Sequence, residues 1–278
     1  MAKKLKANQK QKPFLSKSTL KKLKVITVTF IVIVILLYFH KTVIRYGYQA
    51  YRYFQYASQK RNLTNTVSFP DAFTVHGIDI SRYQPDVDWT TLKAINVDKD
   101  TVAFQFVFIK ATEGLFWEDP TFDENWNDAT EHNIVRGAYH YFKPNSNALL
   151  QAKNFISSVK LKKGDLPPVI DIEEAGKKNK KELVGSLKIY VAAIEKKYGV
   201  KPIIYSNINF IENYLADDFK TYKFWVAHYY VDDLKISNDI NWVFWQYHDR
   251  AHLINSASGF DVNVFNGNKN DFKKLLIK

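Results

Sequence analysis

PPVIDIE, residues 167–173, is an apolar run that ends in two carboxylates, Asp171 and Glu173. Its short length, β-branched residues and flanking prolines predict a buried strand. Alternate side chains of a strand share a face, with their Cα atoms roughly 6 to 7 Å apart. Two acids held this close resist joint ionisation, and a proton-holding acid beside an ionised carboxylate can cleave a glycosidic bond. The alternative to a catalytic pair is that Asp171 and Glu173 are simply solvated side chains at the end of a strand.

The positive charge of this chain is confined to its N-terminal part. The formal net charge is +12, yet residues 1–61 contain fourteen Lys and Arg and no acid. The remaining residues carry 26 basic and 28 acidic side chains, so most of the chain is close to neutral. A nucleic-acid-binding domain would spread basic residues over its folded surface, and we therefore expect no nucleic-acid partner.

The N-terminal part has the layout of a membrane-targeting segment. Nine lysines within the first 24 residues precede an uncharged run that ends at His40. We predict a basic cytoplasmic tail at 1–24 and a single transmembrane helix at 25–40, with the rest of the chain outside the cytoplasm, on the cell membrane. This run is shorter than the ~20 residues that a span prefers, but flanking lysines can snorkel. A cleaved signal peptide and a buried core helix are the alternatives.

Residues 41–70 mix aromatic and basic side chains, among them Tyr46, Tyr51 and Arg52. Such a mixture is typical of a membrane interface, and it predicts a juxtamembrane linker. A helix packed on the domain surface would explain it equally well. The chain contains no cysteine, which excludes disulfides and lipid attachment through a thiol.

From residue 71 to residue 278, short β-rich runs alternate with polar or amphipathic stretches. This alternation predicts one α/β domain with a parallel sheet, and eight strands in that length predict a closed TIM-like barrel. The last three strands follow one another too closely for full helices between them. The predicted strands are 75–80, 104–110, 135–142, 168–173, 202–206, 224–228, 242–247 and 260–265. The predicted helices are 90–96, 121–132, 148–159, 180–198 and 209–215.

Four acids are predicted to meet at one end of this barrel. Chemistry in such barrels gathers at the C-terminal face of the strands. Asp79 lies near the end of the first strand, Asp171 and Glu173 end the fourth, and Asp261 lies in the eighth. Closure makes the first and eighth strands neighbours and places the fourth roughly opposite, so the four carboxylates should face one another across one opening.

Eight short motifs in a fixed order carry a family resemblance. Over residues 73–272 the chain resembles glycoside hydrolase family 25, the Chalaropsis-type lysozymes or N-acetylmuramidases. The matching motifs are DISRYQ (79–84), FIKATEG (108–114), GAYHYF (137–142), DIE (171–173), IYS (204–206), WVA (225–227), WQY (245–247) and DVNVF (261–265).

The resemblance implies a (β/α)5(β)3 barrel that hydrolyses the β-1,4 bond between N-acetylmuramic acid and N-acetylglucosamine in peptidoglycan, with retention at the anomeric carbon. It implies Glu173 as the proton donor and Asp171 as its ionised partner, with Asp79 and Asp261 completing an acidic floor. What differs from the family lies outside the barrel, where we recognise no wall-binding repeats and predict a membrane anchor.

Two other functions are open. A chitinase-like glycosidase would need an Asp-x-x-Asp-x-Asp-x-Glu signature, which fails because Val169 and Leu166 stand four and seven residues before Glu173. A catalytically silent barrel that binds the cell wall is the other alternative, and the intact acids argue against it.

Five further residues are candidates for substrate binding. Aromatic rings suit the apolar faces of sugars, although aromatic residues on barrel strands also build the core, and a histidine there can be purely structural. The candidates are Tyr141, Tyr205, Trp245, Tyr247 and His140.

We expect no metal, no cofactor and a monomer. His76, His228 and His248 lack the spacing of metal ligands, and Ser81 has no evident activating histidine. Glu113, which follows the second strand, is predicted to be a structural residue of the rim.

Overall fold

The computed structural model describes residues 18–19, 21–35, 69–84, 87–93, 95–97, 100–252 and 259–278. The chain forms two compact units, residues 1–50 and 51–278. In the first unit, residues 21–35 are helical. Within the described ranges, no helix combines the length and the hydropathy that crossing a membrane requires. The predicted linker up to residue 68 and residues 36–40 of the predicted transmembrane segment lie outside the described residues.

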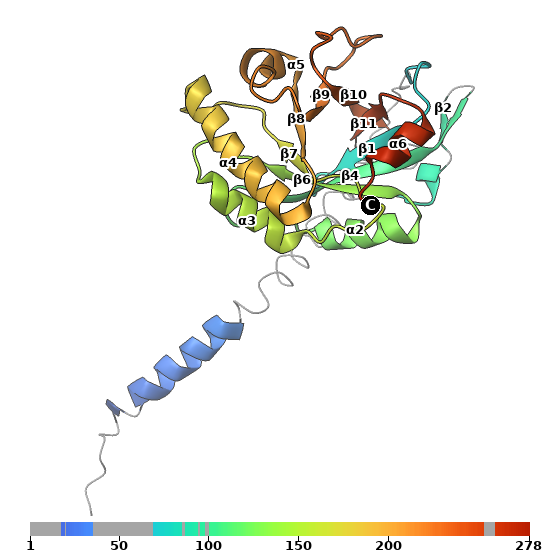
Figure 1. Ribbon diagram of the computed structural model, residues 1–278. Coiled ribbons are helices and arrows are strands. Elements are labelled where there is room, and N and C mark those ends of the chain that lie inside the picture. Colours follow the sequence, from blue (N-terminus) through green and yellow to red (C-terminus); the bar gives the residue numbers. More distant parts are fainter. Residues whose placement is uncertain are drawn as a thin grey trace, which may run out of the picture. The chain divides into compact units, whose positions relative to one another are not determined.

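Eight strands of the second unit close into a barrel (Figure 1), which confirms the eight predicted strands. Around the barrel, each strand pairs with the next and the last pairs with the first. In ring order they are β1 (His76–Ile80), β4 (Phe104–Glu113), β6 (Val135–Tyr141), β7 (Val169–Asp171), β8 (Ile203–Asn207), β9 (Lys223–Ala227), β10 (Trp242–His252) and β11 (Gly259–Phe265). The short strand β5 (Trp117–Glu118) folds back on the end of β4.

Strand β11 runs opposite to the other barrel strands. It pairs antiparallel with β10 and with β1, whereas each of the other pairings around the ring is parallel. Seven strands therefore end at one opening, which we call the mouth, and start at the opposite end, which we call the N-terminal pole. Strand β11 starts at the mouth and ends at the N-terminal pole.

The helices follow the predicted pattern except in the first connection. Figure 1 shows α2 (Phe122–Glu131), α3 (Ala148–Ser158) and α4 (Lys180–Tyr198) outside the strands. After β8 come α5 (Ile208–Phe210) and a π-helix (Ile211–Leu215), and α6 (Lys269–Leu275) ends the chain.

The prediction of a helix at 90–96 is wrong except for a single helical turn. A 3₁₀ turn at Thr91–Lys93 is followed by a small hairpin of β2 (Ile95–Val97) and β3 (Asp100–Val102). The carboxylate of Asp88 accepts the backbone N–H groups of Thr90 and Thr91, which favours a tight turn over a longer helix. Because the described part of the first connection contains no α-helix, the arrangement is an eight-stranded closed barrel without a clear (β/α)5(β)3 pattern.

Helix α4 begins and ends where its sequence predicts. Asn179 accepts the backbone N–H of Glu182, and the Glu182 side chain accepts that of Asn179 in a capping box. Gly199 ends the helix in the left-handed region with φ 71°. These signals fix the lengths of the segments that carry β7 and β8 to their places in the ring.

Two apolar layers hold the barrel together. One layer fills the interior and includes Phe106 and Phe108 of β4, and the other lies between the barrel and its outer helices. Gly77 and Gly137 on the neighbouring strands make room for these two rings. A Cβ at Gly77 would lie 2.4 Å from the Phe106 ring, and one at Gly137 would lie 2.6 Å from Phe108. The interior rings therefore require glycine on both sides of β4.

A buried ion pair connects β6 to the segment before β7. The Arg136 Nε donates to the Asp165 Oδ1 at 2.9 Å, and both side chains are less than a tenth exposed. The guanidinium also lies over the Trp126 ring of α2 and donates to the Trp126 carbonyl at 2.7 Å. Removing one partner would leave the other charge buried and unpaired.

We expect Asp165→Ala to lower the free energy of unfolding by about 3–5 kcal/mol, because the Arg136 guanidinium loses its buried partner. Denaturant unfolding of the full chain in neutral detergent measures this. The control is Asp217→Ala, whose carboxylate is largely exposed and pairs with Lys180 at 3.5 Å. That variant should change stability by less than about 1 kcal/mol. Equal effects of the two variants would contradict the role of burial.

Candidate active site

The mouth brings Asp79 and Asp261 together through strand register. Asp79 lies near the end of β1, Asp261 lies near the start of the antiparallel β11, and the two residues are direct partners in the ladder. Their side chains are hydrogen-bonded to each other. Asp79 is buried and Asp261 half-buried. The predicted convergence of these two acids is therefore present in the structure.

Amide donors hold the Asp79 carboxylate. The side chains of Gln246 and Asn263 each donate to its Oδ2 at 2.7 Å. The Trp225 indole N–H donates to the Asn263 Oδ1 at 2.7 Å, so the position of this amide is fixed from below. Two tyrosine hydroxyls fix the amide of Gln246. Tyr205 donates to its Oε1 at 2.7 Å, and Tyr229 donates to the same oxygen at 2.8 Å.

The Asp79–Asp261 pair holds a proton near neutral pH. Burial raises the pKa of Asp79 to about 7, although the hydrogen bonds from Asn263 and Gln246 act in the opposite direction. Burial and the negative charge of Asp79 raise the pKa of Asp261 to about 9. Asp261 is therefore the member of the pair that carries the proton and donates it toward Asp79.

Asp171 and Glu173 form a second pair across the mouth, on β7 and just after it. Asp171 is buried and its Oδ1 has no hydrogen-bond partner, whereas the Glu173 side chain is exposed. Tyr141 and Tyr205 flank Asp171 as its ladder partners on β6 and β8. The two acids thus differ in environment: one faces the closed interior and the other faces the opening.

Both acids of this pair have raised pKa values, and Asp171 as the ionised partner stays a prediction. Burial raises the pKa of Asp171 well above its ordinary value, and the neighbouring Glu173 carboxylate adds to the rise. Partial loss of hydration at the mouth also raises the pKa of Glu173, but a hydrogen bond from Asp171 and the charge of Lys110 oppose that increase. Because Asp171 is the more deeply buried of the two acids, desolvation opposes its ionisation more strongly in the free protein.

A positively charged group borders the second pair. Lys110 of β4 is buried, donates to the Glu113 Oε2 at 2.7 Å and lies over the Tyr141 ring at 4.8 Å. Lys143 pairs with the other Glu113 oxygen at 3.0 Å and lies over the same ring at 4.4 Å. Glu113 therefore holds two cations in place, in agreement with a structural role, and Tyr141 lies at the mouth as predicted.

Three predicted substrate-binding residues do not reach the mouth. Trp245 and Tyr247 are buried in the outer apolar layer, and Trp245 donates to the His228 carbonyl at 2.8 Å. His140 is fully buried between Thr112 at 2.7 Å and Gln151 at 3.3 Å, and burial lowers its pKa to about 3. These predictions are wrong because each residue lies on the outward face of its strand.

Sequence reasoning missed the residues that point inward from the same motifs. Gln246 lies between the two outward aromatics of WQY, and Asn263 lies two residues after Asp261 on the same face. The period of two along β11 predicts Asn263 once Asp261 is placed. No comparable signal distinguishes the two faces of WQY, and Lys110 lies in a run that is otherwise apolar.

The described residues contain no group of three or more His, Asp or Glu side chains arranged to hold a metal ion. His76, one of the three histidines considered, has its Nε2 2.9 Å from the Phe73 carbonyl, and burial lowers its pKa. What the mouth does offer is acid–base chemistry: two carboxyl pairs, each with one proton, around one opening.

The chain matches known proteins along most of the barrel. The model of glycosyl hydrolases family 25 matches residues 78–255. An uncharacterised Escherichia coli protein named YegX is 42% identical over 72% of this chain and 73% of its own. Lysozyme M1 of Streptomyces globisporus is 29% identical over 73% of this chain and 71% of its own.

A solved structure agrees with the fold. A family 25 glycosyl hydrolase from Bacillus anthracis superposes with a TM-score of 0.69 at 30% identity, covering 78% of this chain and all of that one. The acids at the mouth and these similarities lead to one conclusion: the chain belongs to glycosyl hydrolase family 25 and is a glycoside hydrolase.

Proposed function

We propose that this protein is a membrane-anchored lysozyme, an N-acetylmuramidase that hydrolyses the β-1,4 bonds between N-acetylmuramic acid and N-acetylglucosamine in peptidoglycan. The observation that carries the proposal is the mouth itself, where two proton-sharing carboxyl pairs face each other in a family 25 barrel. The Streptomyces relative is named a lysozyme, and a relative from Arthroderma benhamiae is named an N,O-diacetylmuramidase, which supports this substrate.

Exposure assigns the roles of Glu173 and Asp171. Of the four acids in the two pairs, Glu173 is the one that is exposed at the opening, so it is the acid that can reach a glycosidic oxygen. A sugar bound against Glu173 removes water from it and raises its pKa, which moves the shared proton from Asp171 to Glu173 through their hydrogen bond. Asp171 is then ionised, and its unpartnered Oδ1 can accept the N–H of the substrate's 2-acetamido group.

Retention of configuration follows from this arrangement. The 2-acetamido oxygen attacks the anomeric carbon while Glu173 protonates the leaving oxygen, and Glu173 then activates the water that opens the intermediate. Asp79 and Asp261 form the acidic floor opposite. A competing scheme has one of these two acids attack directly and form a glycosyl-enzyme.

Glu173→Gln should lower the hydrolysis rate by on the order of 10²-fold or more, because the amide keeps the shape but cannot donate the proton. Release of reducing ends from purified peptidoglycan measures the rate. The control is Glu174→Gln, which removes the adjacent exposed acid and should leave the rate nearly unchanged.

Four outcomes distinguish the alternatives. A near-normal rate for Glu173→Gln would refute the assignment of the acid, and a covalent adduct trapped on Asp79 or Asp261 would favour direct attack. Mass spectrometry should find reducing-end muramic acid in the products. Cleavage of chitin in place of peptidoglycan would support the chitinase-like alternative.

The acid pair at the floor should make the folded protein less stable at high pH. The pKa of Asp261 rises from 3.8 to about 9 on folding, so the folded state binds this proton more tightly than the unfolded chain. That stabilisation is complete below about pH 4 and is lost as the pH rises toward 9. Asp261→Asn stays neutral throughout. The free energy of unfolding of this variant, relative to that of the natural protein, should therefore increase by at least about 1 kcal/mol from pH 5 to pH 8.

Denaturant unfolding at the two pH values measures this difference. The control is Asp233→Asn, an exposed acid of the loop after β9, which should show the same pH dependence as the natural protein. An Asp261→Asn curve parallel to that of the natural protein would mean that the pair does not share a proton.

The membrane anchor is proposed from the first unit of the chain. We assign 1–24 to a cytoplasmic tail, 25–40 to a transmembrane segment, 41–70 to a linker and 71–278 to the extracytoplasmic barrel. Apolar side chains of the helix at 21–35 are exposed along its length, from Val25 to Ile35. Such a surface needs a partner, and the lysines before it favour a bilayer with the tail in the cytoplasm.

Protease added to intact spheroplasts should digest the barrel and spare the lysine-rich tail, since flanking Lys and Arg set the orientation. Immunoblots with tags at the two ends, before and after lysis, measure this. Full protection of the barrel would contradict the orientation. A mature N-terminus beyond residue 40 would replace the anchor with a cleaved signal peptide.

A further inference from the structure

A second pocket opens at the N-terminal pole, at the opposite end of the barrel from the mouth. It has a volume of about 520 Å³ and is lined where β7, β8, β9 and β10 begin, where β11 ends, and by α6. Its floor consists of apolar side chains, among them Pro202, Val243, Phe265 and Leu275. None of the residues assigned to the hydrolytic mouth takes part in it.

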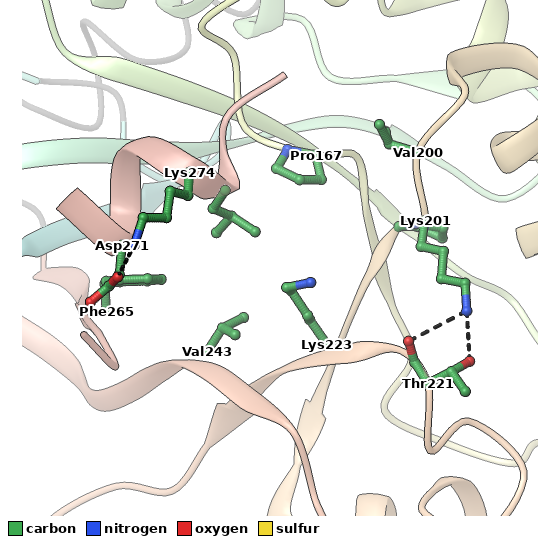
Figure 2. Close-up of a pocket in the computed structure, with 11 residues that line it drawn as sticks. Pro167, Val200, Lys201, Thr221, Lys223, Val243, Phe265, Asp271 and Lys274 are labelled. Atoms are coloured by element: carbon green, nitrogen blue, oxygen red, sulfur yellow. Dashed lines mark hydrogen bonds and ion pairs between the residues drawn. The ribbon is translucent and has the colours of Figure 1, made fainter. Parts of the chain in front are cut away.

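The rim of this pocket carries more positive than negative charge. Figure 2 shows Lys201 with Thr221 on one side, Lys274 with Asp271 on the other, and Lys223 between them. Lys274 and Asp271 neutralise each other at 2.9 Å. Lys201 contacts neutral groups, namely the Thr221 hydroxyl at 2.7 Å and the Tyr222 ring at 4.9 Å.

Lys223 adds to the excess of positive charge at the rim. It is exposed, and no acidic partner for it is found in the part of the chain that the structure describes. Two of the three rim lysines thus have uncompensated charges beside an apolar floor. A ligand that matches both features is an anion with an apolar portion.

More lysines surround the pocket at the same pole. They lie on the segment between α3 and β7, on the last turn of α4 and on α6, and all are exposed. They are Lys160, Lys162, Lys163, Lys196, Lys197 and Lys273. Asp165 is already paired with Arg136 and does not offset this charge, whereas Glu195 at the end of α4, which accepts the Tyr222 hydroxyl, offsets one of these lysines.

The polypeptide enters the barrel beside this pocket. The backbone N–H of Phe265, a pocket residue, donates to the carbonyl of Val75 just before β1. The segment that leads into β1 therefore reaches the barrel at the N-terminal pole.

We propose that the pocket at the N-terminal pole binds the headgroup of an anionic phospholipid, so that the barrel rests on the membrane with its mouth directed toward the glycan. The lysines bind the phosphate, and the apolar floor contacts the first carbons of the lipid chains. A phosphate polymer of the wall would leave this floor unused. The inference goes beyond the proposed catalysis and rests on the proposed anchor only for the nearness of the lipid.

The first test measures binding by the full chain in neutral detergent, with dihexanoyl phosphatidylglycerol as the probe and calorimetry as the readout. Lys201→Gln with Lys223→Gln should weaken binding about 25-fold, because each lysine near an anionic headgroup contributes a factor of about five. The matched control, Lys153→Gln with Lys181→Gln, removes the same charge from α3 and α4 and should bind within twofold of the natural protein.

Further probes separate the possible sources of the anion. Dihexanoyl phosphatidylcholine should bind far more weakly than the anionic lipid, and inorganic phosphate or polyglycerol phosphate should compete poorly. Equal binding of the two lipids, equal weakening in both double variants, or tighter binding of polyglycerol phosphate would each overturn the proposal. Because this test is done in detergent, it does not depend on the anchor.

The second test measures orientation on vesicles. The chain has no cysteine, so a fluorophore can be placed uniquely at Lys220→Cys near the pocket or at Phe116→Cys in the loop between β4 and β5, near the mouth. Spin-labelled phosphatidylglycerol should quench the label at 220 and spare that at 116. The reverse pattern would overturn the orientation. Loss of the protein from neutral vesicles in a flotation assay would instead refute the anchor.

Discussion

The ladder between β1 and β11 brings the carboxyl groups of Asp79 and Asp261 to one rung, where neither is hydrated as it would be in water. Two buried like charges at this separation are unfavourable, so one acid keeps its proton. The charge that remains on Asp79 is stabilised by hydrogen bonds from the side-chain amides of Gln246 on β10 and Asn263 on β11. The antiparallel direction of β11 is the constraint on which the mouth depends. A parallel β11 would place Asp261 at the same distance from its start but at the N-terminal pole.

The two ends of the barrel differ in how their buried polar groups are paired. At the N-terminal pole, the buried Arg136 is paired with Asp165, and Phe272 of α6 packs against Phe106 and Phe265. At the mouth, by contrast, acids have raised pKa values and the Asp171 Oδ1 has no partner. An unsatisfied buried acceptor reduces stability, and it persists where a ligand can supply the missing donor.

The difference between Asp171 and Glu173 explains how neighbouring acids on one segment can take separate roles. Backbone alternation gives both the same face, but the end of β7 leaves one inside the barrel and the other at its opening. Burial, and not residue type, makes the ionisation of Asp171 the less favourable of the two before substrate arrives. A ligand that dehydrates Glu173 can reverse that order without moving the backbone.

The sequence by itself determined the eight barrel strands, the positions of α2, α3 and α4, and the meeting of Asp79, Asp171 and Asp261 near one opening. These follow from local patterns, namely short β-branched runs, helix caps such as Asn179 and Gly199, and acids at strand ends. Only the tertiary structure decided the direction of β11, the outward placement of Trp245, Tyr247 and His140, and the depth at which Asp171 is buried. The physical reason is that each of these depends on what lies across the barrel: which neighbour a strand pairs with, which face of a strand meets the interior, and how much water reaches a carboxylate.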